Sequence, residues 1–598
     1  MPAAAAVSSS PQASDPVVLL ERALQTGIVA ALGESFRDAD PVIKPSQNPQ
    51  FGDFQANGAM ALAKQAGLKP RDLAQKIVDG AATELKAIAD KVEIAGPGFI
   101  NVRLKGEALA SALHAMAEAP RSALGVEPDT DTHNVVVDLC GVNVAKQMHV
   151  GHLRATIIGD ALARVFERLG RNVFRQNHLG DWGLPIAMVL HQLRLNKVDL
   201  DRLEIADLDR AYREAQKHDD PASLEGAKQT LVKLQNGDAE LLRDWHKLID
   251  CTMRSVYQAL EILNVHLSED SNRGESFYRD RLAGVVDAFV RSGLAKEDKG
   301  AIVVPFADRE RPLLIRKSDG GYLYSTTDLA AVRYRVQELG ADRVVYVVDA
   351  RQRDHFKDVF DAARLIGWTK LPDSTDAEVR HIGFGMVLGE DKTPLKTRSG
   401  ENVTLKSLLD EAIARGTAEV LKRAEDPLAP THGLPRSELQ AIGRAVGIGA
   451  VKYADLTNDL VRDYIFSLDR MIAFEGNTGP YIQYAHARIC SIFAKAGIGM
   501  GAARGELRVS EPAERTLALA LLRYGGVVHD VARSLEPHRL CTFLFDLANT
   551  FSAFYQECPV LKAEDAATRD SRLRLCDLAR RVLADGLNLL GIEAPQRM

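Results

Sequence analysis

The sequence predicts a multidomain fold: a small α+β N-terminal domain, then an α/β domain with a Rossmann-like parallel sheet, then an all-α C-terminal bundle. Three observations lead to this prediction. The chain has 598 residues, enough for several domains. Strand and helix patterns alternate from residue 134 onward, which is typical of a parallel sheet. From about residue 405 onward the pattern is helical, and we expect no further strand.

The composition indicates an ordinary globular protein, with 46% hydrophobic and 26% charged residues. No run of about 18 apolar residues occurs, so we expect no membrane span. The formal net charge is −6, so any nucleic acid would have to bind to local basic patches. Six cysteines without a CxxC pair argue against a zinc ribbon and a disulfide framework. Residues 1–15 are expected to be a disordered tail without a signal or transit peptide, and the cysteine pattern favours a reducing cytoplasm.

The N-terminal domain is expected over residues 16–118. Within it, NPQFGDFQANGAMALAKQAG predicts a turn followed by an amphipathic helix. The stretch VEIAGPGFINVRL predicts two alternating strands separated by Gly96, Pro97 and Gly98.

The α/β domain is expected over residues 130–404. A strand at 134–139, a helix at 150–169 and a strand from 172 form one β-α-β unit. A charged, helical insertion at about 190–295 interrupts the domain, and strand patterns then return. The segment SDGG predicts a hairpin turn, and Ser325 or Thr326 is expected to cap the helix that follows it.

The stretch NVAKQMHVGHLRATIIGDALARVFERLG joins the first strand to its helix. It places His149, Gly151 and His152 at the helix N-terminus, where free N–H groups and the helix dipole favour phosphate. Lys146 lies three residues before His149 and adds a positive charge. Two imidazoles could donate hydrogen bonds to a phosphate there. The alternative interpretation is that the histidines only cap the helix.

A second basic segment, DKTPLKTRSG, follows the last predicted strand of this domain. Lys392, Lys396 and Arg398 could stabilise a departing pyrophosphate if the loop closed over a triphosphate. The alternative is a solvated surface turn.

Together, these motifs resemble those of the arginyl-tRNA synthetases, with HVGH in the place of the HIGH signature of class I aminoacyl-tRNA synthetases. The matching segments run in family order from 134 to 490 and include QNHLGDWG, YLYSTTD, YVVDARQRDH, MVLGEDKTPLKTRSG, AVKYADL and FEGNTGPYIQYAHARIC. The N-terminal GDFQANGAMALAK and GPGFINVRL resemble that family's tRNA-binding module. The resemblance implies a stem and anticodon-binding domain over residues 405–598.

This resemblance implies how ATP is bound and activated. It assigns catalysis to His149, His152 and Lys146, and ATP binding to His149, Gly151, His152, Met386, Val387 and Lys396. The loop PLKTR departs from the family's KMSKS motif, because Pro394 and Thr397 stand where lysines are usual. Lys146 would supply the missing charge from the opposite wall.

An arginine pocket needs carboxylates and amides that can receive a flat guanidinium with five donors. Asp328 lies one helical turn after Tyr324, so both side chains can face one pocket. The resemblance assigns the amino acid to Asp138, Asn143, His149, Tyr324, Asp328 and Gln352. Taken singly, each of these residues is more often a helix cap or a surface group.

The resemblance implies a cytoplasmic, monomeric arginine–tRNA ligase that uses ATP, L-arginine and tRNA(Arg) and forms an arginyl-adenylate. Mg²⁺ would come with ATP rather than sit in a protein site of its own, and no membrane is involved. Anticodon bases would stack on arginines or on aromatic side chains such as Tyr453 and Tyr481. Two alternatives remain: a different HxGH nucleotidyl transferase that acts on a small acid, or a catalytically inactive tRNA-binding paralogue.

Overall fold

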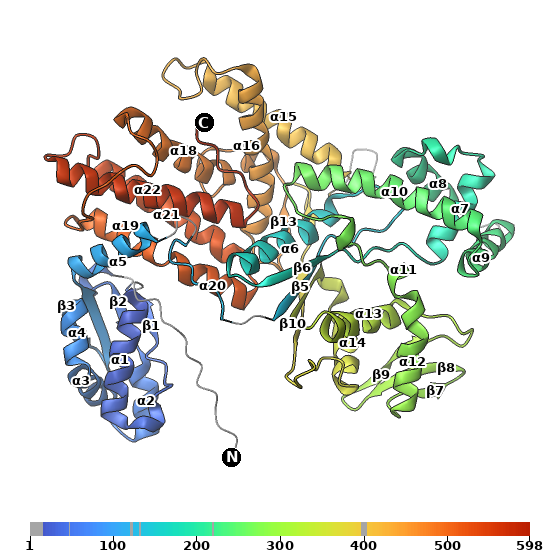
Figure 1. Ribbon diagram of the computed structural model, residues 1–598, viewed down its shortest axis with the longest axis horizontal. Helices are drawn as coiled ribbons and strands as arrows, with labels where there is room; N and C mark the ends of the chain where they lie inside the picture. Colours follow the sequence, from blue (N-terminus) through green and yellow to red (C-terminus); the bar gives the residue numbers. More distant parts are fainter. Residues whose placement is uncertain (1–15, 47, 120–122, 131–132, 218–220, 396–402) are drawn as a thin grey trace.

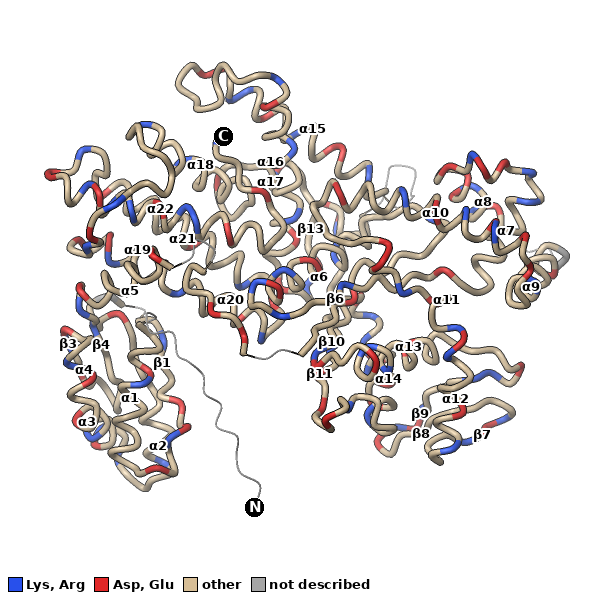
Figure 2. Tube along the Cα trace, viewed as in Figure 1, with Lys and Arg blue, Asp and Glu red and all other residues tan. Residues whose placement is uncertain are grey.

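The computed structural model describes residues 16–46, 48–119, 123–130, 133–217, 221–395 and 403–598. The tail expected at 1–15 and the loop residues Lys396 and Arg398 lie outside these ranges. Figure 1 shows the N-terminal domain beside the C-terminal bundle, with the parallel sheet in the centre and the helical insertion at the far end. In Figure 2, acidic and basic residues are interspersed over most of the chain. No helix in the described ranges is long and apolar enough to cross a membrane.

The N-terminal domain is an α+β unit, as predicted. Its antiparallel sheet has the strand order β1-β2-β4-β3. Its elements are α1 (Pro16–Leu32), β1 (Ile43–Pro45), β2 (Phe54–Ala56), α2 (Gly58–Ala66), α3 (Pro70–Gly80), α4 (Ala82–Ile88), β3 (Ala89–Ala95), β4 (Phe99–Leu104) and α5 (Gly106–Glu118). Leu20, Leu24 and Ile28 form a buried stripe on α1 because they recur every four residues.

The central sheet is parallel throughout, which confirms the predicted α/β architecture. Its strand order is β11-β10-β5-β6, with β5 (Asn134–Asp138), β6 (Asn172–Gln176), β10 (Ala341–Asp349) and β11 (Glu378–Phe384). Val135, Val136 and Val137 of β5 are fully buried, as the continuous apolar run of a strand covered on both faces requires. Helix α6 (Val150–Arg168) connects β5 to β6 and packs against the sheet.

Helices α7–α10 follow β6 and form most of the insertion seen at one end of Figure 1. The elements between β6 and β10 are α7 (Leu184–Leu195), α8 (Ile205–Lys217), α9 (Pro221–Gln235), α10 (Ala239–Ile262), α11 (Glu275–Tyr278), α12 (Leu282–Arg291), β7 (Lys296–Asp298), β8 (Ala301–Phe306), β9 (Arg309–Arg316), α13 (Tyr324–Arg333) and a π-helical turn (Tyr334–Glu338). Helix α14 (Arg353–Leu365) lies between β10 and β11. Strands β7, β8 and β9 form a separate antiparallel sheet.

Two local predictions were wrong. Helix α13 begins at Tyr324 with Leu323 at the N-cap, because the hydroxyls of Ser325 and Thr326 donate to the carbonyls of Leu314 and Ile315 in β9. A strand also occurs after residue 405: β13 (Tyr464–Ile465) pairs in parallel with β12 (Val387–Leu388). Two residues are too few for an alternating pattern to be recognised.

The C-terminal region is otherwise helical. Its helices are α15 (Leu405–Ala424), α16 (Arg436–Leu456), α17 (Leu468–Met471), α18 (Gly479–Ala496), α19 (Pro512–Leu522), α20 (Tyr524–Ser534), α21 (His538–Glu557) and α22 (Ala566–Leu589). Helices α15 and α16 approach closely, because Gly416, Gly443 and Gly447 line their contact.

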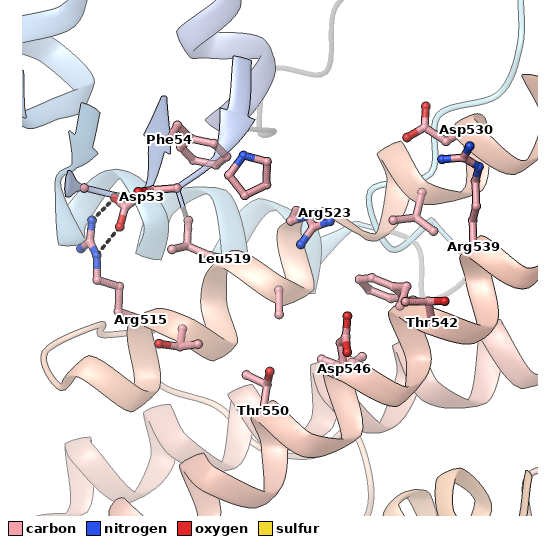
Figure 3. Close-up of a pocket in the computed structure, with 18 of the residues that line it drawn as sticks. Asp53, Phe54, Arg515, Leu519, Arg523, Asp530, Arg539, Thr542, Asp546 and Thr550 are labelled. Atoms are coloured by element: carbon pink, nitrogen blue, oxygen red, sulfur yellow. Dashed lines mark hydrogen bonds and ion pairs between the residues drawn. The ribbon is translucent and has the colours of Figure 1, made fainter. Parts of the chain in front are cut away.

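The N-terminal domain is joined to the bundle by ion pairs. Arg515 of α19 binds both carboxylate oxygens of Asp53, with Nε 2.9 Å from Oδ1, and also donates to the carbonyl of Leu104. Arg574 of α22 pairs with Glu118 at 2.6 Å. A cavity of about 650 Å³ lies between β2 and helices α19–α21, and Figure 3 shows the Asp53–Arg515 pair at its edge.

Candidate active site

The HVGH turn caps helix α6 through its own histidines. His149 is the N-cap residue in an extended conformation, and its Nδ1 accepts a hydrogen bond from the backbone N–H of Gly151 at 3.0 Å. Nδ1 of His152 accepts from the backbone N–H of His149 at 3.1 Å. A ring nitrogen that accepts carries no proton, so in each neutral ring Nε2 is the donor. Capping the helix and donating to a phosphate are therefore compatible.

Both imidazoles are neutral at physiological pH. Burial, followed by the charge of Lys146, lowers the pKa of His149. Burial, followed by the neighbouring His149, lowers the pKa of His152 to about 3. The two rings are thus neutral hydrogen-bond donors, and the positive charge at this turn comes from Lys146 and the helix dipole.

The loop between β5 and α6 has an unusual backbone. Cys140 and Ala145 have φ angles of 73° and 67°, in the left-handed region that non-glycine residues rarely adopt. Two hydrogen bonds hold the loop: Gly141 N–H donates to Asn177 Oδ1 at 3.0 Å, and Ala145 N–H donates to Thr252 Oγ1 at 3.1 Å. Left-handed residues cost about 1 kcal/mol or more each and persist only where their surroundings enforce them. The hydrogen bond from Ala145 to Thr252 thus ties the backbone next to Lys146 to helix α10 of the insertion.

Lys146 faces a small cavity that the helical insertion helps to build. Its Nζ lies 3.9 Å from the ring centroid of Tyr212 on α8. The cavity, of about 280 Å³, is also lined by Asn143, Trp182 and Glu275. The structure therefore brings two of the predicted residues, Asn143 and Lys146, to one cavity.

Glu275 is a half-buried carboxylate that lines this cavity and was not among the predicted residues. Burial, followed by the charges of Asp181 and Asp328, raises its pKa to about 7. Asp181 in turn accepts hydrogen bonds from the backbone N–H and the hydroxyl of Ser276, at 2.9 and 2.6 Å. Nothing in the local sequence pattern singles out Glu275, because it reads as an ordinary acidic residue at the start of a short helix.

His355 of α14 contacts both Tyr324 and Asp328. Like Glu275, it was not among the predicted residues. The Nε2 atom of His355 lies 2.6 Å from Asp328 Oδ2, and the two side chains are 15% and 13% exposed. The rings of His355 and Tyr324 have centroids 4.9 Å apart. His355 lies within the segment YVVDARQRDH, but no spacing rule connects it to Asp328.

Asp138 already has a partner in the structure. Its Oδ2 lies 2.8 Å from Nη2 of Arg335, whose side chain is fully buried in the π-helical turn. Arg335 also donates to Gln176 Oε1 at 2.8 Å and lies over the ring of Tyr346. The guanidinium nearest to Asp138 is therefore one from the chain itself.

Among the remaining predicted residues, Gln352 and Met386 are exposed. Gln352 forms the N-cap of α14. Met386 is 38% exposed and Val387 7%, and the backbone N–H of Met386 donates to Asp463 Oδ1 at 2.6 Å. Lys392 precedes the undescribed part of its loop. In the described ranges, no three His, Cys, Asp or Glu side chains gather as a metal site.

Two aromatic residues were predicted to stack on anticodon bases, and for Tyr453 this prediction was wrong. Its side chain is fully buried, with the hydroxyl 2.6 Å from Asn477 Oδ1 and 3.0 Å from the Cys541 carbonyl oxygen. It packs α16 against α21 and has no face for a base. Tyr481 is half-buried and remains a prediction.

The parallel sheet and the HVGH turn at the start of α6 define a class I aminoacyl-tRNA synthetase. The family model described as "tRNA synthetases class I (R), catalytic domain" matches residues 121–468. The models for the "Arginyl tRNA synthetase N terminal domain" and the "DALR anticodon binding domain" match residues 20–104 and 482–598. The chain belongs to the arginyl-tRNA synthetase family.

Relatives extend this similarity over nearly the whole chain. An arginine–tRNA ligase of Thermobifida fusca is 46% identical over 595 residues, which cover 98% of this chain and all of that protein. One from Erwinia tasmaniensis is 46% identical over 94% of this chain and 96% of that protein. The crystal structure of arginyl-tRNA synthetase from Plasmodium falciparum superimposes with a TM-score of 0.81 at 28% identity, over 97% of this chain and 98% of that one.

Proposed function

We propose that this chain is an arginine–tRNA ligase that makes arginyl-tRNA(Arg), AMP and diphosphate from ATP, L-arginine and tRNA(Arg). The carboxylate of arginine attacks the α-phosphorus of ATP, pyrophosphate leaves, and arginyl-adenylate forms. The terminal ribose hydroxyl of the tRNA then attacks the carbonyl carbon, loses its proton, and releases AMP. The observation that carries the proposal is the neutral histidine pair beside Lys146, next to a cavity lined by Glu275.

The ATP half of the site is built on α6 and β12. His149 and His152 donate from Nε2 to the α-phosphate, and Lys146 balances the charge that develops as pyrophosphate leaves. Gly151 lets the nucleotide approach the backbone, and a Cβ there would lie 2.7 Å from the His149 ring and displace it from its capping position. Met386 and Val387 bind the adenine, and Lys396 lies on the loop that covers the phosphates. Positioning and charge stabilisation supply most of the rate enhancement.

The arginine half uses separate groups for the two ends of the amino acid. Asp328, Tyr324 and Gln352 receive the guanidinium, and a carboxylate is the partner that can do so bidentately. Asn143 and Glu275 receive the α-ammonium group, and His149 the carboxylate. Asp138, which is already paired with Arg335, supports the pocket through this buried ion pair.

The proposal includes the following partners and surroundings. Mg²⁺ accompanies ATP and is held by phosphate oxygens, which a hard cation prefers. The N-terminal domain and the bundle bind tRNA(Arg), and the enzyme works as a monomer. Six buried, unpaired cysteines are compatible with a reducing cytoplasm.

The test is pyrophosphate exchange with each of the twenty amino acids, with and without tRNA(Arg). We expect exchange with arginine alone, and, as the family resemblance implies, only when tRNA is present. Exchange with a different small acid would favour the other nucleotidyl transferase. Tight tRNA binding without any exchange would favour the inactive paralogue.

A further inference from the structure

Arg154 is a buried arginine in α6 that takes no part in the chemistry proposed above. It lies two residues after His152, and its side chain is 1% exposed. Its Nε lies 3.3 Å from Asp455 Oδ1 on α16. Its Nη1 donates to the carbonyl oxygens of Gly385 at 2.9 Å and Arg462 at 3.1 Å. One guanidinium thus connects the HVGH helix to three other segments of the chain.

The carboxylate of Asp455 completes this connection. Asp455 is fully buried in the last turn of α16, within the segment AVKYADL, and its Oδ2 accepts from the Tyr464 hydroxyl at 2.9 Å. The guanidinium of Arg154 lies 5.4 Å from the Tyr464 ring centroid and 5.6 Å from that of Phe384. Arg154, Asp455 and Tyr464 form what we call the α6–α16 bridge.

The segment that the bridge contacts also holds Met386 and Val387. The backbone N–H of Tyr464 donates to the Met386 carbonyl at 3.2 Å, and the N–H of Gly385 donates to the Leu460 carbonyl at 2.9 Å. Figure 1 shows β13 beside α6. A Cβ at Gly385 would lie 2.6 Å from Asp463 Oδ1, so the two segments are in close contact. The position of β12 is therefore set by residues 460–466, and Arg154 binds to both segments.

We propose that Arg154 and Asp455 are positioning residues that hold the HVGH turn and the Met386–Val387 strand at the separation that ATP requires. This inference rests on the proposed function, which places the phosphates of ATP at the HVGH turn and the adenine at Met386 and Val387. A misplacement of 1 Å between binding groups can cost about a hundredfold in rate. Tyr324, Asp328 and Gln352, which receive the guanidinium, lie on or next to α13 and α14 and not on the bridged segments, so weakening the bridge affects ATP much more than arginine.

The same helix offers a matched control. Arg164 of α6 pairs with Asp160 at 2.7 Å, and their side chains are 7% and 1% exposed. Arg164 donates to the carbonyl of Asn264 at 2.6 Å, so this pair fastens α6 to the insertion. It is buried and ionic like the α6–α16 bridge, but the further partners of Arg164 are Asn264 in the insertion and Asn588 in α22, not residues of β12 or β13.

The experiment compares Arg154→Lys and Asp455→Asn with Arg164→Lys and Asp160→Asn in the full-length enzyme with tRNA present. We expect the first two to raise the KM for ATP by about tenfold or more, with the KM for arginine within about twofold of wild type. The control variants should lower the Tm and leave both KM values within about twofold. Tyr464→Phe removes only one hydroxyl, so it should stay folded and raise the KM for ATP by a smaller factor.

An unchanged KM for ATP in Arg154→Lys and Tyr464→Phe would overturn the inference. An equal rise in the control variants would also overturn it, since any loosening of α6 would then suffice. If the wild-type protein shows no arginine-dependent exchange, the proposed function fails instead. In that case, equilibrium dialysis measures the Kd for ATP of the same variants. The bridge variants should then raise this Kd by about tenfold or more, and the control variants should stay within about twofold of wild type.

Discussion

Four carboxylates gather around the candidate arginine pocket, opposed by the buried guanidinium of Arg335 and the ammonium group of Lys146. Asp181 and Asp328 act electrostatically on Glu275, and Asp138 pairs with Arg335. Carboxylates that lie close together in a desolvated site raise each other's pKa, and such a site favours a positively charged ligand. A substrate with a guanidinium and an α-ammonium group supplies those positive charges. The electrostatics of the site thus agree with the proposed amino acid.

Asp328→Asn should raise the KM for arginine about a hundredfold or more and leave the KM for ATP nearly unchanged. Removing one partner of a buried charged pair costs about 3–5 kcal/mol, and each 1.4 kcal/mol is about tenfold in affinity. Steady-state exchange kinetics check this result. An unchanged KM for arginine would leave Asp328 with a structural role only, as the partner of His355.

The KM for arginine should fall as the pH rises from about 6 to 8. Glu275 has a pKa raised to about 7, so below this pH its carboxyl is neutral and cannot pair with the α-ammonium group. Glu275→Gln should have a high KM for arginine that no longer varies over this range. A pH series at saturating ATP measures both enzymes. If the variant kept the wild-type pH dependence, another group would be responsible for it.

Lys146→Ala should lower kcat by about 10²–10³ with little change in the KM for arginine. This is the usual cost of losing one group that stabilises charge only in the transition state. Lys396→Ala should be milder, because this residue stands where the family motif has a serine. Single-turnover adenylate formation compares the two variants. A larger defect in Lys396→Ala would refute the relocation of charge to the HVGH side.

At the scale of elements, the contact between α15 and α16 depends on glycine. A Cβ at Gly447 would lie 2.2 Å from the carbonyl oxygen of Ala412, and one at Gly443 would lie 2.4 Å from the Thr417 Cα. Backbone atoms at such distances cannot yield without separating the helices. Since α16 also carries Asp455, this packing helps to place the ATP site.

Gly447→Ala should lower the free energy of unfolding by about 1–3 kcal/mol, the usual cost of overpacking. Gly526→Ala in α20 is the control, because a Cβ there meets nothing within 4 Å. Alanine is the better helix former, so the control should be neutral or more stable by about 0.5–1 kcal/mol. Urea unfolding followed by circular dichroism compares them. Equal effects would show that steric contact at Gly447 is not the cause.

At the scale of the whole molecule, the two regions proposed to bind tRNA are fastened to each other. Asp53 follows the turn at Pro49–Phe51 and pairs with Arg515 of α19. The side chains of Asp53 and Arg515 are only 7% and 15% exposed. The Glu118–Arg574 pair adds a second link. The orientation of the N-terminal domain toward the bundle is therefore held by these ion pairs together with the packing of α5 against α19.

Arg515→Met should raise the KM for tRNA several-fold, with the KM values for ATP and arginine unchanged. The change leaves a buried carboxylate without its charged partner, at a cost of about 1–3 kcal/mol or more, and lets the N-terminal domain move. Arg539→Met, an exposed arginine in the same cavity that pairs with Glu536, is the control. An unchanged KM for tRNA in Arg515→Met would show that the Asp53–Arg515 pair is not needed for tRNA binding.

Much of the fold could be predicted from local patterns. The strand at 134–138 and helix α6 lie where apolar periodicity placed them, because burial imposes a period of two or 3.6 on the residues themselves. The N-cap of α13 and strand β13 were missed, because hydrogen bonds to β9 and pairing with β12 decide them. Tyr453 was misjudged for the same reason, since an aromatic residue on a helix carries no sign of which neighbours cover it.

The sequence by itself determined the family, the order of the domains, and the placement of His149, His152 and Lys146 at a helix N-terminus. These follow from residues adjacent in the chain, whose spacing is set by the geometry of a strand and a helix. Only the tertiary structure decided that Asp138 pairs with Arg335, that His355 holds Asp328, and that Glu275 joins Asn143 and Lys146. Each of these contacts joins residues tens to hundreds of positions apart. Folding, and not local spacing, brings their charges into one desolvated site.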